Sequence, residues 1–407
     1  MKTKLTVILA FVVLNSAMAA EIHFPRLEMV TLGRTLNDEF GFSTSVSADL
    51  ALSGGFKYGL EMGFSFDSLN LAKTLAYKNF KFQHLPNPGD PLITDDYNDL
   101  VDRINDRIDN SGIFTFRLLK ASLRDLFNLP LEFNFFVGEG DIYCSGDEFS
   151  RRFGSEPVGS YYRGLFYFPD GIGGNVSRRY YGIHSAEGTG ISMAFTLWDS
   201  FVPMIYIYEN FPLFMNTTGD FGKSFYSGDL RFLINREKFK MDFFGGLSYK
   251  DGVIIRAGLL THFFTGKGIE FLLQGGITGW DLNEALNIDS FFFLLEPRFR
   301  FGIFGFYGTL FFHPVTYNNI TTIEEQGKTD INLRFFAEIP NTNFMAGIET
   351  GIGLRIKEME DFTFCVSPFF SFVGSGIQWD TKVRVNLFGN DGLKEMFELF
   401  IGVSTSF

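Results

Sequence analysis

The chain has 407 residues, of which 45% are hydrophobic and 53 are phenylalanine, and its formal net charge at pH 7 is -12. An acidic chain of this kind has no electrostatic basis for binding nucleic acid. After residue 20 there is no run of about 18 apolar residues, so the sequence predicts no membrane-spanning helix in the mature chain.

The first twenty residues have the features of a secretory signal peptide. Lys2 and Lys4 form a basic region, an apolar run extends from Leu5 to Leu14, and Ala17-Met18-Ala19 is a small-x-small cleavage site. The apolar run is too short to span a bilayer. We therefore expect residues 1–20 to be removed on export, which takes the net charge from -12 to -14 because two lysines are lost.

Most of the mature chain alternates between apolar and polar residues. Between Phe56 and Phe66 every second residue is apolar, and the positions between them carry Lys57, Glu61 and small residues. A β-strand turns successive side chains to opposite faces, so this period predicts a strand with one apolar and one polar face. The segments have about 10 to 13 residues, which matches a tilted membrane strand better than the shorter strands of a soluble sandwich.

Strands of this type are expected along almost the whole chain. Their positions are 22–32, 40–51, 55–67, 112–124, 131–142, 161–168, 178–186, 190–199, 202–209, 225–236, 238–249, 252–264, 268–280, 290–303, 304–314, 329–340, 343–357, 361–373, 376–388 and 396–407. Because single-chain bacterial barrels have an even number of strands, this series predicts about 18, within a range of 16 to 20. We expect one all-β domain over residues 21–407, a closed antiparallel transmembrane β-barrel with its apolar face in outer-membrane lipid.

One long insertion, residues 68–111, interrupts the series of strands. It contains Pro86-Asn87-Pro88-Gly89 and, further on, Leu100, Ile104 and Ile108 at helical spacing. We expect a long outer loop with a short amphipathic helix. Two placements are left open, since the helix either folds into the pore as a constriction or packs on the outer rim.

The segment 117–163 resembles part of a known family. A run from Leu119 to Pro130 contains Asp125-Leu126-Phe127-Asn128, and it is followed by Val137-Gly138-Glu139-Gly140-Asp141 and Gly146-Asp147-Glu148-Phe149. This order resembles a strand, periplasmic turn and rising strand of larger bacterial porins of the alginate-export and substrate-specific types. Asn128 and Glu139 stand where those porins commonly have Gly and Arg. The resemblance covers about a tenth of the chain and implies a porin-like barrel, without a substrate and without an anion preference.

The expected connections alternate between short and long. Short turns are expected at 235–238, 265–268, 341–343 and 374–375, and longer polar links around 210–224, 281–289, 315–328 and 389–395. Short periplasmic turns and longer outer loops are typical of outer-membrane barrels. This alternation therefore gives the barrel an expected orientation.

The last expected strand ends on an aromatic residue. Its apolar face carries Phe397, Leu399, Ile401, Val403, Thr405 and Phe407. It resembles the terminal strand of bacterial outer-membrane proteins, which closes with an aromatic residue and is read by the barrel assembly machinery. The resemblance implies that Phe407 is the assembly signal and that this machinery is a partner of the chain.

The opposite faces of the strands carry charges of both signs, which we expect to line a pore. The basic residues are Lys57, Arg117, Arg231, Lys240, Arg256, Arg298, Arg300, Arg334, Arg355, Lys382 and Arg384. The acidic residues are Glu61, Glu132, Asp229, Asp242, Glu270, Glu296, Glu338, Glu349, Asp380 and Glu398. Charges turned inward need water or partners, because burying them dry is costly. A hydrated pore is favoured, since a ring of this strand number holds water, and ion-pair ladders that brace a narrower, partly filled barrel are the alternative.

No pattern in the sequence indicates an enzyme, a cofactor or a metal site. The chain has no H-E-x-x-H motif, no G-x-S-x-G motif and no phosphate-binding loop. Cys144 and Cys365 lie far apart in the sequence and have no metal-type spacing, and their pairing as a disulfide is left open.

We therefore predict an exported outer-membrane channel of a two-membrane bacterium, through which small hydrophilic solutes diffuse passively. Strong charge selectivity is not expected from a wall with nearly balanced charges. A transporter of hydrophobic compounds of the fatty-acid-channel type is an alternative, although residues 21–39 are short for its N-terminal hatch. A non-conducting adhesin or structural barrel is the other. An oligomer is compatible with the sequence, which carries no signal for it.

Overall fold

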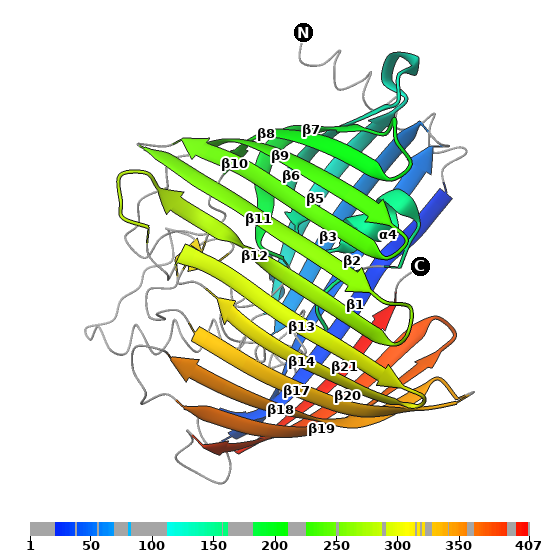
Figure 1. Ribbon diagram of the computed structural model, residues 1–407, viewed down its shortest axis with the longest axis vertical. Coiled ribbons are helices and arrows are strands. Elements are labelled where there is room, and N and C mark those ends of the chain that lie inside the picture. The colour runs from blue at the N-terminus through cyan, green and yellow to red at the C-terminus, as the bar shows by residue number, and fades with distance from the viewer. Residues whose placement is uncertain are drawn as a thin grey trace.

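The computed structural model describes residues 21–36, 39–54, 57–68, 80–82, 112–156, 158–161, 182–210, 225–249, 252–286, 290–313, 316–317, 320–321, 328–340, 342–355, 362–388 and 396–405. In this part of the chain, 18 long strands form one closed antiparallel ring (Figure 1). The closed barrel and the strand number predicted from the sequence are confirmed.

The ring contains the following strands in chain order. They are β1 (Glu21–Leu36), β2 (Glu39–Gly54), β3 (Tyr58–Ser68), β5 (Gly112–Arg124), β6 (Leu131–Tyr143), β7 (His184–Phe195), β8 (Phe201–Asn210), β9 (Phe225–Arg236), β10 (Phe239–Tyr249), β11 (Val253–Phe264), β12 (Ile269–Asp281), β13 (Phe291–Phe301), β14 (Phe304–His313), β17 (Lys328–Ile339), β18 (Phe344–Arg355), β19 (Thr363–Gly374), β20 (Ile377–Phe388) and β21 (Phe397–Thr405).

Short elements complete the described structure. They are β4 (Phe80–Phe82), which pairs parallel with β5, the small hairpin of β15 (Thr316–Tyr317) and β16 (Ile320–Thr321), the single turn η2 (Leu126–Asn128), and α4 (Asp147–Phe153). Within the described ranges, no helix is long and apolar enough to cross a membrane.

The ring closes between its first and last strands. β1 pairs with β2 on one side and with β21 on the other, with Leu27 opposite Thr405 and Gly33 opposite Leu399. Every strand of the ring therefore has two antiparallel neighbours, and no edge is left to expose backbone groups to lipid.

The structure differs from the expected strand list between β6 and β8. The segments 178–186 and 190–199 were expected as two strands, but His184–Phe195 is one strand, paired with β6 through Gly138 and Gly188. Those glycines break the apolar alternation without breaking the pairing. Tyr161 lies in a bend, and the rest of the expected strand 161–168 lies outside the described residues, as does the helix expected near 100–108.

The two faces of the wall differ as a membrane barrel requires. Outward side chains are large and apolar, as at Ile207, Phe335 and Trp379, which are 60%, 49% and 48% exposed. Their neighbours Tyr206 and Arg334 turn inward and are buried. An apolar outer band lets the wall contact lipid without burying charge.

The two ends of the barrel also differ. Short connections such as Glu237-Lys238, 302–303 and 375–376 lie at one end, called here the short-turn end. The longer connections follow the ends of β3, β6, β8, β12, β14 and β20, and these strand ends lie at the other end of the barrel. The alternation expected from the sequence is present, and β1 begins and β21 ends at the short-turn end, because Leu27 pairs with Thr405 and Ile377 does as well.

Candidate functional site

The connection that follows β6 folds inward and is called here the lumen strap, residues 144–161. It begins with Cys144 and Gly146 in left-handed backbone conformations, with φ values of 56° and 87°. A side chain at Gly146 is excluded, because a Cβ there would lie 1.3 Å from the carbonyl oxygen of Val158. The Val158 amide donates to the Gly146 carbonyl (3.3 Å), so the strap closes on itself and includes α4.

α4, the helix of the lumen strap, lies inside the ring of strands (Figure 1), and the strap contacts the inner face of the barrel at both of its ends. Near its start, the Cys144 amide donates to Asp242 of β10 (2.8 Å), and the Gln274 side chain of β12 donates to the Cys144 carbonyl (2.6 Å). At its far end, the Tyr161 hydroxyl donates to Asn332 of β17 (2.7 Å). The strap is therefore anchored to strands on widely separated parts of the ring.

One buried charge network binds α4 to β6. Arg152 donates to Glu132 of β6 (3.0 Å) and forms an i,i+4 pair with Glu148 (3.1 Å). Burial alone would raise the pKa of the Glu148 carboxyl, but Arg151 and Arg152 hold it below its usual value. Glu148 at the start and Arg151 and Arg152 at the end of α4 also match the helix dipole.

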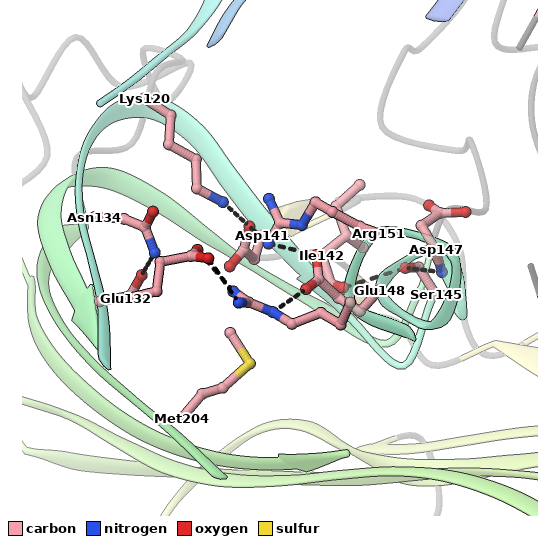
Figure 2. A network of polar contacts seen from close by, with 12 residues as sticks. Lys120, Glu132, Asn134, Asp141, Ile142, Ser145, Asp147, Glu148, Arg151 and Met204 are labelled. Carbon is pink, nitrogen blue, oxygen red and sulfur yellow. Dashed lines mark hydrogen bonds and ion pairs between the residues drawn. The ribbon is translucent and has the colours of Figure 1, made fainter. Parts of the chain in front are cut away.

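A second part of this network reaches β5 and β8. Lys120 donates to Asp141 (2.5 Å), and Arg151 approaches the same carboxylate (3.1 Å), as Figure 2 shows. The Tyr206 hydroxyl donates to the other oxygen of Asp141 (2.7 Å). Three donors from two strands and the strap thus satisfy one buried carboxylate, which offsets the cost of its burial.

A third network lies where β6 meets β9, β10 and β11. Arg231 binds Asp242 through two nitrogens (2.9 and 2.6 Å), and both side chains are 0% exposed. Arg256 pairs with Asp229 (2.6 Å), which also accepts the Tyr143 hydroxyl (3.0 Å). Because Asp242 also accepts the strap amide described above, these pairs fix the strap to the wall.

Further contacts hold the second half of the lumen strap. Lys240 donates to the Ser155 hydroxyl (3.0 Å) and to the Glu156 carbonyl (2.9 Å). Glu296 of β13 accepts hydrogen bonds from the Ser160 hydroxyl and from the Tyr161 amide, the latter at 3.3 Å. The inner faces of β6 to β12, called here the strap wall, are thus covered by a well-anchored segment.

A cavity of about 350 Å³, called here the lumen cavity, lies beside the far end of the strap. Its lining residues are Glu28, Tyr161, Arg300, Tyr307, Arg334, Phe336, Glu338, Met345, Gln378 and Asp380. They belong to β1, the strap, β13, β14, β17, β18 and β20, and the inner faces of β13 to β20 and of β1 are called here the cavity wall. Several lie within a few residues of tight turns, so the cavity is near the short-turn end.

Part of the lining of the lumen cavity belongs to an aromatic layer with cations against its rings. The Arg334 guanidinium lies 4.0 Å from the Phe369 ring centre and binds Glu349 (3.0 Å), which also accepts Lys382 (3.0 Å). The Phe336 ring fills the space left by Gly305 of β14, where a Cβ would lie 2.1 Å from the ring. The more exposed charges Arg300 and Glu338 also line the cavity.

The residues expected to line a pore fall into two groups. Ten are buried, each with an ion pair or hydrogen bond: Glu132, Asp229, Arg231, Lys240, Asp242, Arg256, Glu296, Arg334, Glu349 and Lys382. The others are half-buried or exposed: Lys57, Glu61, Arg117, Glu270, Arg298, Arg300, Glu338, Asp380, Arg384 and Glu398. Lys57 lies in the turn before β3. The Arg355 side chain and Phe407 lie outside what the structure describes.

Sequence reasoning placed several of the strap's anchors on the inner face but missed Lys120, Asp141 and Arg151. Lys120 faces inward because the pairing of β3 with β5 shifts at Gly63, and this bulge reverses the alternation after Arg117. Asp141 and Arg151 were missed because their partners are brought together only by the inward fold. The lack of alternation between 144 and 160 was the available signal that this segment is not a strand.

Neither cysteine forms a disulfide, and no metal cluster is found among the described residues. Cys144 is buried in the strap and Cys365 is half-buried on β19, and both thiols are free. Burial and the nearby Asp242 carboxylate raise the pKa of the Cys144 thiol. Among the described residues, no group of three or more His, Cys, Asp or Glu side chains is arranged to hold a metal ion.

Comparison with known proteins identifies structures with a similar fold but no relative by sequence. No protein-family model and no curated protein matches the chain. Among solved structures, OccK8 (OprE) of Pseudomonas aeruginosa superposes with a TM-score of 0.52 at 10% identity, covering 96% of this chain and 98% of that one. OccAB2 of Acinetobacter baumannii gives 0.53 at 10% identity, covering 95% and 98%. The chain therefore has a porin-like fold, and this fold with its apolar outer surface places the barrel in a bacterial outer membrane.

Proposed function

We propose that the barrel is a channel for the passive diffusion of small hydrophilic solutes across the outer membrane. The observation that carries this proposal is the polar lumen cavity beside the strap. In this proposal residues 1–20 direct export and the terminal strand with Phe407 directs assembly. Solutes pass between the strap and the cavity wall, because the strap wall is covered.

The exposure of the charges supports a path along the cavity wall. The side chains of Arg300 and Glu338 are 51% and 48% exposed although both face inward. Charges with this much accessible surface are stable only where water reaches them. A water-filled passage beside the cavity wall accounts for them, whereas a fully packed lumen would not.

The same lining disfavours hydrophobic cargo. Six of the ten residues that line the lumen cavity are charged or carry an amide, among them Glu28, Gln378 and Asp380. An apolar solute would strip water from these groups without replacing their hydrogen bonds, which is costly. The lining therefore suits solutes that carry hydrogen-bonding groups of their own.

Single-channel recording in a planar bilayer tests the proposal. Refolded mature protein at high salt is expected to give stepwise openings with a stable conductance. Protein that is shown to be folded by heat-modifiable migration but gives no openings would contradict the channel and favour a non-conducting barrel. Whether loosening the strap changes the conductance is a separate question, so the first experiment uses the unmodified chain.

A further inference from the structure

The lumen cavity carries more carboxylates than available cations. Its acidic lining is Glu28, Glu338 and Asp380, and its basic lining is Arg300 and Arg334. The charge that a solute meets depends on which of these groups lack a partner of opposite charge. The partners of each group therefore determine the effective charge of the cavity.

Both guanidinium groups are engaged by the wall. Arg334 binds Glu349 (3.0 Å) with its side chain only 8% exposed. Arg300 directs two nitrogens to the Tyr307 hydroxyl (2.8 and 2.5 Å) and has Glu338 at 3.4 Å. Hydrogen bonds already made within the wall would have to be broken before either group could bind an anion in two-point fashion.

Asp380 is in the opposite position. Its two oxygens accept hydrogen bonds from the neutral Gln378 amide (3.1 and 3.0 Å). Within the described part of the chain it forms no ion pair, because Lys382, two residues along β20, donates to Glu349 instead (3.0 Å). Asp380 thus presents to the cavity that it lines a carboxylate without an ion-pair partner among the described residues.

The strand register spaces the acids for a small solute. Glu338 is opposite Met345, Met345 is opposite Ser371, and Ser371 is opposite Asp380. Three strand spacings of about 4.8 Å separate the backbones of Glu338 and Asp380 by about 14 Å along this row. Between them the row carries Met345, which lines the cavity, and the small Ser371, which is buried. A solute with an ammonium group and a short apolar chain fits this row, with the ammonium group at a carboxylate and the chain against Met345.

We propose that the lumen cavity binds small organic cations in transit, and that Asp380 is the residue that sets this preference. The inference rests on the proposed channel function and adds its solute class. A cation gains chiefly from Asp380, which an anion meets as repulsion. Glu338 adds less, because the Arg300 guanidinium lies 3.4 Å from it.

Block of the potassium chloride current by three matched probes tests this. Butylammonium, butyrate and butan-1-ol have the same chain and differ in charge. We expect butylammonium to block at the lowest concentration. In Asp380→Asn, which keeps the side-chain shape, its blocking concentration is expected to rise about fivefold, the factor that one charge at about 4 Å contributes in water.

Two further variants make the result specific. Glu338→Gln is expected to weaken block by butylammonium in the same direction as Asp380→Asn. Glu237→Gln removes the same charge at the same end of the barrel, but Glu237 lies in the exposed β9–β10 turn, away from the cavity, so no change is expected.

The outcomes separate this inference from the channel itself. Absence of any current would contradict the channel function. A current that butyrate blocks as well as butylammonium does, or an unchanged block in Asp380→Asn, would overturn the cation site while leaving the channel intact. An equal loss in Glu237→Gln would show a general field effect and would also overturn the role of Asp380.

Discussion

Two ion pairs of the same kind have opposite environments in this barrel. Arg231 and Asp242 on the strap wall are 2.6 Å apart and 0% exposed, whereas Arg300 and Glu338 on the cavity wall are 3.4 Å apart and about half exposed. Each pair joins inward side chains of the ring, so strand alternation does not distinguish them. The lumen strap does, because it covers the first pair and leaves the second open. Whether an inward charge is buried or reaches water is therefore decided by the lumen strap and not by the strands.

The largest effect on stability is expected from breaking the covered pair, Arg231 and Asp242. Arg231→Met leaves the Asp242 carboxylate buried without its cation, and removal of one partner of a buried pair costs about 3–5 kcal/mol. We expect a loss of this size in the free energy of unfolding in urea, together with a noisier and larger single-channel current as the strap loosens. The double variant Arg231→Met with Asp242→Leu is expected to recover much of the stability, and failure to do so would mean that the carboxylate is not the source of the cost.

A packing change on the cavity wall should cost less. A Cβ on Gly347 of β18 would lie 2.1 Å from the Phe335 carbonyl oxygen and 2.8 Å from Phe336, so Gly347→Ala displaces the strand or the aromatic layer. Overpacking of this kind costs about 1–3 kcal/mol. Gly245→Ala is the matched control, because a Cβ there meets nothing within 4 Å. Equal unfolding free energies for the two variants would contradict the packing described for β17 and β18.

The far anchor of the strap is expected to contribute a smaller amount. Tyr161→Phe removes only the hydroxyl that donates to Asn332 (2.7 Å), which corresponds to about 0.5–1.5 kcal/mol for a single hydrogen bond. Because the strap end borders the lumen cavity, we also expect more frequent brief closures in single-channel records. A record indistinguishable from that of the unmodified chain would mean that the remaining anchors hold the strap without Tyr161.

The smallest effect is expected from the exposed pair. A double-mutant cycle with Arg300→Gln and Glu338→Gln should give a coupling energy of about 0.2–1 kcal/mol, which salt should reduce further. The same cycle on Arg231 and Asp242 should be several times larger and less sensitive to salt. Similar coupling energies at the two sites would remove the distinction between the covered and the open wall.

The fold could be predicted from the sequence because the strands carry their own signal. Alternation from Phe344 to Leu354, for example, predicts β18 without reference to any partner, since one face meets lipid and the other does not. The candidate site could not be predicted in the same way. Whether Asp380 or Lys382 has a partner depends on Glu349 of another strand, and whether Arg231 is covered depends on the course of residues 144–161.

The anchors of the lumen strap have a consequence for the order of folding. Tyr161 binds Asn332, 171 residues later in the chain, and Ser160 binds Glu296, 136 residues later. Contacts across such long stretches carry a large loop-closure entropy and form after the local hairpins. The first half of the strap is therefore expected to settle on β9 and β10 as soon as those strands pair, while its second half waits for β13 and β17. The lumen strap would then reach its final structure only after most strands have paired. A chain stopped after β12 would hold the strap by its first half, with its second half still unattached.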